Sequence, residues 1–212
     1  MKKLFKCEAS CRFCKVFNKE NALGKIDTPW MEDNDYIAMT SLGGFIEGWT
    51  LVIPRAHIFS MLGLYNEKNL VQFVNQAIIK IKSKYNKRCI IFEHGANHEG
   101  SVVACGTNHA HLHILPYEKS LLEEMEKDDK VWVRCGINEI KSLVGDNEYW
   151  FYAEAVDDIS IVKGYVHIVE ESESQYFRRI LAKLENCDEQ YNYKEYQFRE
   201  IAEATYDVMA EM

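Results

Sequence analysis

A short segment in which histidines alternate with apolar residues constrains the fold of this chain more than any other feature. It reads His-Ala-His-Leu-His-Ile-Leu over residues 109–115 and ends at Pro116. In a β-strand, side chains two positions apart point to the same face of the sheet. The pattern therefore predicts a strand with three histidines on one face: His109, His111 and His113. The other face is apolar and packs against a core: Ala110, Leu112 and Ile114.

Hydrophobic patterns elsewhere predict an α+β fold, in which a long helix packs on an antiparallel sheet. Apolar residues recur at three- and four-residue steps over residues 70–81, which predicts one buried helical face. Further strands are expected at residues 36–42, 50–53, 89–92, 131–134, 149–155 and 159–169. Further helices are expected at residues 118–129, around 176–184, and from about 196 to the end. Helices placed between and after antiparallel strands are typical of the α+β class.

A change in composition near residues 119–130, where an acidic helical stretch follows the strand, suggests two parts. The first, residues 1–118, is expected to carry the functional residues and a metal-binding N-terminal segment. The second, residues 119–212, is an α+β C-terminal extension, packed on the first part or continuing its sheet.

The charge and the lack of long apolar runs exclude several function classes. The chain has 212 residues and a net charge of −8 at pH 7, which argues against generic binding to nucleic acid or a membrane surface. A locally built pocket can still bind a phosphate group. No apolar run approaches the roughly 18 residues that span a bilayer, and no apolar stretch follows the basic residues 1–6 as in a signal peptide. We therefore expect a cytoplasmic protein.

The cysteines and histidines are the residues from which chemistry is expected. Seven cysteines without a signal peptide indicate free thiols or metal ligands, and three cluster near the start: Cys7, Cys11 and Cys14. The three histidines on one face fit a metal site, since imidazole is the commonest metal ligand. They fit nucleophilic catalysis equally well, with one imidazole attacking and a neighbour binding phosphate oxygens.

Three ordered motifs resemble the histidine triad (HIT) family of nucleotide hydrolases and transferases. Residues 109–115 match the signature His-φ-His-φ-His-φ-φ, where φ is apolar, at every position. Residues 48–57, Gly-Trp-Thr-Leu-Val-Ile-Pro-Arg-Ala-His, resemble the upstream strand Gly-His-x-Leu-Val-Ile-Pro-Lys-x-His. Residues 11–15, Cys-Arg-Phe-Cys-Lys, resemble the Cys-x-x-Cys start of many bacterial members. Residues 92–95, 174–179 and 191–196 look like parts of a longer HIT-like subgroup.

The resemblance implies a role for each residue that matches the motifs. His111 would be the nucleophile that attacks the α-phosphorus, and His113 would donate to a phosphate oxygen. His109 completes the triad, and in members with Cys-x-x-Cys its counterpart also binds zinc. The implied structural Zn²⁺ site has four ligands: Cys11, Cys14, His57 and His109. Cys7 is a spare thiol or an alternative ligand.

Five further residues are expected at the substrate: Trp49, Thr107, Asn108, Gln175 and Arg178. Trp49 replaces the histidine of the family's Gly-His pair, and Ser41 falls where a ribose-binding aspartate is often found. Residues 104–108 lack the usual Gly-Gln-Ser/Thr arrangement, so Thr107 or Asn108 would have to assist the leaving group. Arg178 and Arg179 open an amphipathic helix, and an arginine suits polyphosphate through its forked donors, whereas a solvated helix face explains them at least as well. Gln175 belongs to the same stretch, residues 174–179.

The resemblance favours a nucleotide hydrolase that cleaves a dinucleoside polyphosphate or a nucleoside phosphoramidate. The expected partner is the nucleotide, with no membrane, and a homodimer is compatible with the family. One alternative is a catalytically weak nucleotide-binding or RNA-processing accessory module of the same fold. Another is a catalytic metal site made by His109, His111 and His113.

Overall fold

A single antiparallel sheet runs through the part of the chain that the computed structural model describes, residues 8–171 and 173–211. Its strand order is β1-β2-β3-β5-β4-β7-β8-β6, and every neighbouring pair is antiparallel. The strands span Met31–Glu32 (β1), Tyr36–Thr40 (β2), Thr50–Pro54 (β3), Cys89–Gly95 (β4), Leu112–Pro116 (β5), Val133–Gly136 (β6), Tyr149–Ala153 (β7) and Lys163–Ile168 (β8). The α+β class predicted from the sequence is confirmed.

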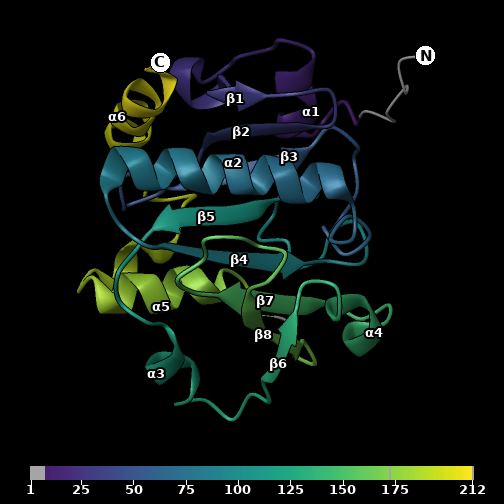
Figure 1. The fold of residues 1–212 in the computed structure, drawn as a ribbon. Helices are drawn as coiled ribbons and strands as arrows, with labels where there is room; N and C mark the ends of the chain where they lie inside the picture. The colour runs from purple at the N-terminus through teal and green to yellow at the C-terminus, as the bar shows by residue number, and fades with distance from the viewer. Residues whose placement is uncertain (1–7, 172, 212) are drawn as a thin grey trace.

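The helices flank the sheet (Figure 1). They span Arg12–Phe17 (α1), Lys68–Tyr85 (α2), Leu122–Met125 (α3), Ile140–Val144 (α4), Tyr176–Leu184 (α5) and Arg199–Ala210 (α6), with 3-10 turns at Gly24–Asp27 (η1) and Asp188–Tyr191 (η2). None of the helices within the described ranges is long and apolar enough to cross a membrane.

Three predicted elements differ clearly from the structure, and α1, α4 and β1 were not predicted. The strand expected over residues 159–169 is β8 and begins only at Lys163, after a turn at residues 159–161. The helix expected over residues 118–129 is only α3, because no apolar residue follows Met125 before Val131, and such a segment has no face to bury. The histidine strand begins at Leu112 instead of at residue 109. The backbone N–H of Ala110 donates to the Ile58 carbonyl, so this segment bonds to a loop before it joins the sheet.

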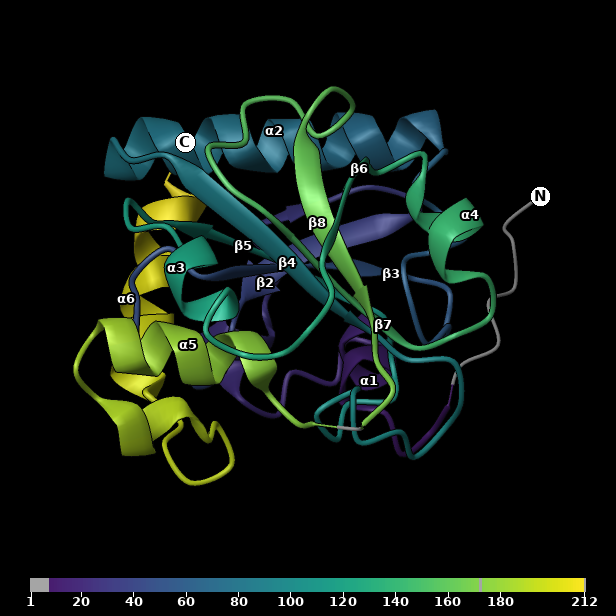
Figure 2. The ribbon, with the colours of Figure 1, turned by 90° about the horizontal axis from the view of Figure 1, so that it is seen from below.

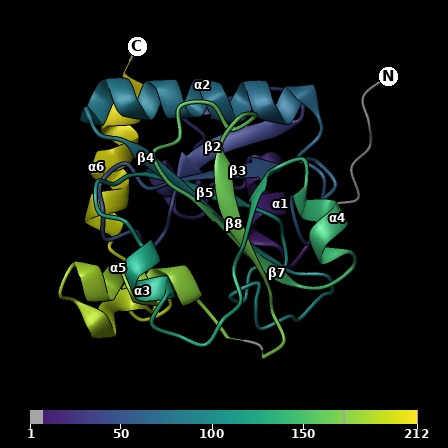
Figure 3. The same cartoon turned by 60° about the horizontal axis from the view of Figure 1, so that its bottom comes forward.

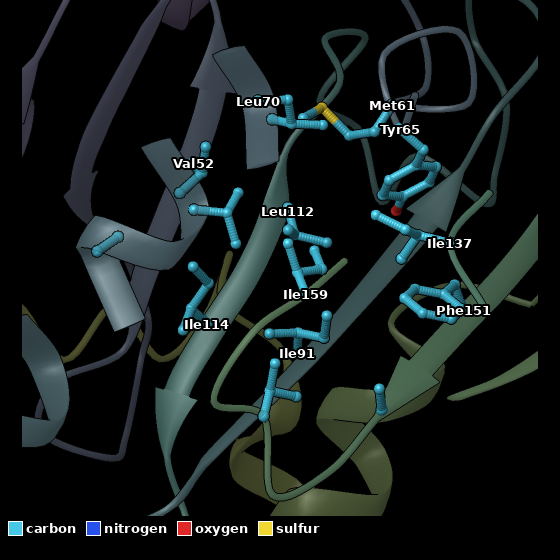
Figure 4. Close-up of a cluster of buried hydrophobic side chains, with 14 of the residues drawn as sticks. Val52, Met61, Tyr65, Leu70, Ile91, Leu112, Ile114, Ile137, Phe151 and Ile159 are labelled. Carbon is cyan, nitrogen blue, oxygen red and sulfur yellow. The ribbon is translucent and has the colours of Figure 1, made fainter. Parts of the chain in front are cut away.

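The two faces of the sheet carry separate cores, as the view from below shows (Figure 2). Helix α2 covers one face, where its apolar residues pack on strand residues such as Val52, Ile91, Leu112 and Ile114 (Figure 4). Helices α1 and α5 lie on the opposite face, where α5 contributes Phe177 and Leu181 to a second cluster with Phe92 and Trp150. The histidine face of the 109–115 segment is turned toward this second side.

Residues beyond 118 continue the sheet and also return to its first half. Strand β7 pairs along β4 with Phe92 opposite Tyr152. Helix α6 then lies beside one end of α2, so the C-terminal part spans both faces (Figure 3). At Gly43, where φ is +72°, a Cβ atom would lie 2.5 Å from the Cβ of Tyr193, so the close approach of the C-terminal segment requires glycine there.

Candidate active site and metal centre

Strand β5 places His113 near the middle of the sheet, and His109 and His111 lie in the segment just before it. It lies between β3 and β4, with His113 opposite Leu51 on one side and Phe92 on the other. The predicted alternation is present in full, since Ala110, Leu112 and Ile114 belong to the core under α2. The imidazole centroids of His111 and His113 are 4.8 Å apart.

Two cysteines and two histidines meet at one end of the site. The possible ligand atoms of Cys11, Cys14, His57 and His109 all lie within 4.8 Å of one another. The Nδ1 atoms of His57 and His109 are 3.2 Å apart. Cys11 Sγ lies 3.4 Å from His109 Nδ1, and Cys14 Sγ lies 3.4 Å from His57 Nδ1. Typical zinc bond lengths give tetrahedral edges of about 3.3 Å between two nitrogens and about 3.5 Å between nitrogen and sulfur. The four residues therefore fit one tetrahedral ion.

Contacts behind this cluster orient its ligands. His109 Nε2 lies 2.8 Å from the Pro54 carbonyl oxygen, which only accepts, so Nε2 donates and the Nδ1 lone pair faces the sulfur atoms. The backbone N–H of Glu8 donates to Cys14 Sγ at 3.4 Å. Burial lowers the pKa of His109 to about 4, which keeps this imidazole neutral near pH 7. Cys7 lies outside the described residues.

His111 presents a free nitrogen lone pair. Its Nδ1 lies 2.9 Å from the carbonyl oxygen of His109, so Nδ1 carries the proton and donates. In a neutral imidazole the other nitrogen, Nε2, then has an exposed lone pair. Burial lowers the pKa of His111, which favours this neutral form. His111 can therefore act as a nucleophile.

His113 has the opposite arrangement. Trp49 Nε1 lies 2.9 Å from His113 Nδ1, and an indole nitrogen only donates, so Nδ1 accepts. Burial lowers the pKa of His113 well below the ordinary histidine value, so the ring is neutral and its proton is on Nε2. His113 can therefore donate a hydrogen bond to a ligand oxygen.

A pocket opens at these two histidines. Residues from the N-terminal, central and C-terminal parts of the chain line it: Arg12, Phe13, Ser41, Leu42, Leu51, His94, Cys105, Thr107, His111, His113, Arg178 and Tyr193. Its only formally charged side chains among the described residues are Arg12 and Arg178. Asp27 pairs with Arg12 at 2.7 Å and balances its charge, so Arg178 is the lining cation that remains for a ligand. In a chain with a net charge of −8, this cation and the lack of a carboxylate in the lining favour an anionic ligand.

The C-terminal extension supplies the more buried of the two arginines. Arg178 is 4% exposed and donates from Nε to the Tyr191 carbonyl and from Nη2 to the Gly43 carbonyl. Its guanidinium carbon lies 4.7 Å from the centroid of the Trp49 ring. Burial lowers the pKa of Arg178 to about 10, so the group stays charged near pH 7.

The other predicted substrate residues take different positions. Thr107 lines the pocket with Ser41, whereas Trp49 lies behind His113 and Asn108 accepts a hydrogen bond from the Gly100 N–H. Gln175 supports the pocket wall, because its backbone N–H donates to Cys105 Sγ and its Oε1 accepts from the Tyr193 N–H.

Four lining residues were not singled out from the sequence, although each lies in a segment that the motifs include: Arg12, Phe13, Cys105 and Tyr193. The Phe13 ring lies 5.7 Å from the His111 ring, although the two residues are far apart in the chain. The Tyr193 hydroxyl donates to the Cys105 carbonyl. Only the spacing of Cys11 and Cys14 could have placed Arg12 and Phe13 here, since both lie between the two metal-ligand candidates.

Comparisons with known proteins agree with these motifs. No family model matches the chain. An uncharacterised HIT-like protein of Borreliella burgdorferi is 29% identical over 117 residues, which cover 52% of this chain and 77% of the relative. A solved HIT-like protein of Bartonella henselae, described as involved in cell-cycle regulation, has a TM-score of 0.42 at 20% identity and covers 54% of this chain and 85% of its own. A hypothetical histidine triad nucleotide-binding protein of Sulfolobus tokodaii has a TM-score of 0.39 at 24% identity and covers 52% and 70%.

The chain thus combines an antiparallel sheet, a long helix on one of its faces and alternating histidines on the other. The predicted resemblance is confirmed as a likeness: over 52% of its length the chain is similar to the HIT-like protein of Borreliella.

Proposed function

We propose that the chain is a nucleotide hydrolase that cleaves a phosphorus anhydride or phosphoramidate bond through a covalent intermediate on His111. The observation that carries this proposal is the pair of opposite tautomers on adjacent histidines. His111 offers a lone pair on Nε2, and His113 offers a proton on Nε2, because their Nδ1 atoms donate and accept, respectively. A nucleophile beside a hydrogen-bond donor suits attack on a phosphate group.

In the first step, His111 Nε2 attacks the α-phosphorus, a phosphorus–nitrogen bond forms, and the bond to the leaving group breaks. The leaving group departs with the bonding electron pair and takes a proton from solvent. In the second step, water attacks the phosphorus, the phosphorus–nitrogen bond breaks, and the water proton is released. His113 and Arg178 stabilise the negative charge of the phosphoryl oxygens in both steps.

We propose further that Cys11, Cys14, His57 and His109 hold one structural Zn²⁺. Two thiolates and two imidazoles are a closed donor set with no position left for a substrate. This assignment uses His109 in the metal centre and leaves His111 and His113 for the phosphate. It opposes a catalytic metal bound by all three histidines, since His113 accepts from Trp49 at Nδ1 and carries its proton on Nε2, so that neither nitrogen has a lone pair for a metal.

Intact-protein mass spectrometry after rapid quenching tests the nucleophile. Wild type, H113A and H111A are each mixed with a diadenosine polyphosphate or with an adenosine phosphoramidate. We expect wild type or H113A to gain one adenylyl group and H111A to gain none, while circular dichroism shows that all three remain folded. An adduct in H111A would contradict the assignment of His111.

A binding assay and a metal count separate the remaining alternatives. Nucleotide binding without adduct or product from either substrate would replace the hydrolase with the accessory binding module. One zinc per chain in wild type and in H111A supports the structural site. About two metals per chain, with one lost in H111A, would instead support a catalytic metal centre.

A further inference from the structure

Two aromatic side chains outside the histidine segment, Phe92 and Trp49, enclose the His113 ring. Phe92 stacks on its ring with centroids 4.3 Å apart and planes inclined by 18°. Trp49 meets it edge-on at 5.9 Å and makes the hydrogen bond to Nδ1. Because His113 is 5% exposed and Trp49 is 1% exposed, water has little access to replace that bond.

The hydrogen bond from Trp49 determines which nitrogen of His113 carries the proton. A neutral imidazole carries one proton, and its two nitrogens are not equivalent. If the proton moved to Nδ1, two N–H groups would face each other inside the enclosure, and Nε2 would present a lone pair beside the lone pair of His111. An anionic ligand would then meet two acceptors and no donor at the histidines, which is unfavourable.

The Trp49 indole is itself held from the C-terminal extension. The Arg178 guanidinium stacks 4.7 Å from the ring centroid, and the carbonyls of Tyr191 and Gly43 fix that guanidinium. Phe45 packs on the indole from another side at 5.4 Å. A cation over an indole face is attracted by the ring electrons, most strongly where water is excluded.

We propose that Trp49 is a positioning residue that keeps the proton of His113 on Nε2, and that Arg178 holds the Trp49 indole in the orientation this requires. The consequence for catalysis rests on the hydrolase function proposed above, whereas the proton position does not. The C-terminal extension thereby takes part in the chemistry of the histidine strand.

Nitrogen-15 NMR of the histidine side chains tests the proton position directly, in metal-loaded protein without substrate near pH 7.5. Long-range proton–nitrogen correlations distinguish the two neutral tautomers. In wild type we expect His113 to carry its proton on Nε2 and His111 to carry its proton on Nδ1. In W49F we expect the His113 Nδ1 resonance to lose its hydrogen-bonded shift and a population with the proton on Nδ1 to appear.

The second measurement is steady-state kinetics with the substrate that gives the adenylyl adduct on His111. We expect W49F to lower kcat about tenfold with less than about a threefold change in KM, as for a lost hydrogen bond that supports the transition state. W150F is the matched control. Trp150 is fully buried on the same side of the sheet, but its Nε1 has no hydrogen-bond partner among the described residues, so the same atoms are removed without a lost bond. W150F should leave the His113 resonances unchanged.

Several outcomes would overturn the proposal. A proton on His113 Nδ1 in wild type contradicts it, and so does a W49F protein with unchanged His113 resonances and unchanged kcat. R178M tests the second part, because unchanged Trp49 Nε1–H and His113 resonances in R178M would remove Arg178 from it. If no nucleotide is turned over but the tautomers respond as expected, the hydrolase function fails and the positioning role of Trp49 stands.

Discussion

Each of the three histidines on the 109–113 segment uses one ring nitrogen to contact the protein, and that contact determines the use of the other nitrogen. His109 donates to the Pro54 carbonyl and turns Nδ1 toward the cysteines. His111 donates to the His109 carbonyl, and His113 accepts from Trp49. The proposed function accordingly assigns to these three identical side chains a metal ligand, a nucleophile and a hydrogen-bond donor.

The buried positive charge of Arg178 is expected to bind the phosphate of the ligand. Replacement by methionine removes the buried cation but keeps much of the side-chain volume. The loss of a charge-assisted hydrogen bond to phosphate costs about 1.5–3 kcal/mol, so we expect kcat/KM for R178M to fall about 10- to 100-fold. The matched control is R179M. Arg179 stacks on Tyr191 and lies 3.7 Å from Glu173, outside the pocket, so R179M should stay near wild type. Equal losses in both variants would contradict this prediction.

Glu93 is a buried carboxyl group on the face of β4 that points toward α2. It is 1% exposed, and its oxygens accept from the hydroxyls of Tyr65 and Tyr149, both at 2.5 Å, and from the Met61 N–H at 2.6 Å. Burial raises its pKa from 4.5 to about 7, against the opposing effect of these donors. The native state therefore keeps the proton at pH values where the unfolded chain has released it.

We predict that the free energy of unfolding falls as the pH rises from about 4.5 to about 7 because of Glu93, by up to about 3 kcal/mol, and is level above that range. Glutamine cannot lose a proton, so E93Q should lack this decrease. Urea unfolding of both proteins between pH 5.5 and 8 measures the difference, in which contributions from other titrating groups cancel. A constant difference between the two proteins across this range would show that Glu93 does not titrate there.

At the scale of elements, the N-terminal segment connects the Cys11–Cys14–His57–His109 cluster to the pocket. Helix α1 begins between the two cysteines, so an ion held by Cys11 and Cys14 also fixes Arg12 and Phe13 beside His111. Apart from the metal ligands, α1 is attached by the pair between Arg12 and the buried Asp27, at 2.7 Å, and by packing of Phe13 and Val16 on β2 and β3.

Metal removal should therefore affect both stability and activity. Removal of the ion would take away the ligand that two thiolates and two imidazoles share, and with it a crosslink between three distant parts of the chain. We predict that a chelator lowers Tm and raises KM, and that added Zn²⁺ restores both. C14S should show the same changes without a chelator, whereas C187S, with a thiol far from this cluster, should not. A Tm that does not respond to the chelator would contradict this prediction.

Local patterns predicted most elements, and distant contacts explain the differences. The helix expected over residues 70–81 is the buried centre of α2, and the three- and four-residue spacing of Leu70 to Ile81 was sufficient to find it. The alternation of His109 to Ile114 predicted the two faces of the segment. It could not show that β5 starts at Leu112, because that depends on a hydrogen bond from Ala110 to a loop 52 residues earlier, at Ile58.

At the scale of the whole molecule, the candidate site is assembled from segments that only the complete sheet brings together. Through their resemblance to the HIT family, the cysteine and histidine motifs implied the four members of the candidate metal cluster. They could not predict the pocket wall formed by Tyr193 and Cys105, because pairing across 88 residues depends on the order of strands in the sheet. The strand order also makes β4, which continues the histidine face through Phe92, the neighbour of both β5 and β7.

This arrangement predicts that residues on both sides of position 118 unfold together. Phe177 of α5 packs on Phe92 at 4.9 Å and on Tyr152 at 5.9 Å, so it joins the extension to the strand beside the triad. We expect F177A to lower the free energy of unfolding by about 3–5 kcal/mol, as for a buried aromatic side chain. Far-UV circular dichroism and tryptophan fluorescence should still give coincident transitions in metal-loaded protein.

I161A is the control, because Ile161 is 78% exposed and its truncation should leave both curves nearly in place. If residues 119–212 instead formed an independent unit, the transitions of F177A followed by fluorescence and by circular dichroism would no longer coincide. The fluorescence of Trp132 and Trp150 in the extension would then change at lower urea concentration than the circular dichroism of the remaining sheet. If the circular dichroism and fluorescence curves stay coincident and shift together, the sheet, the second core and the pocket unfold as one cooperative structure. A substitution in the extension then also lowers the stability of the segment that carries the three histidines.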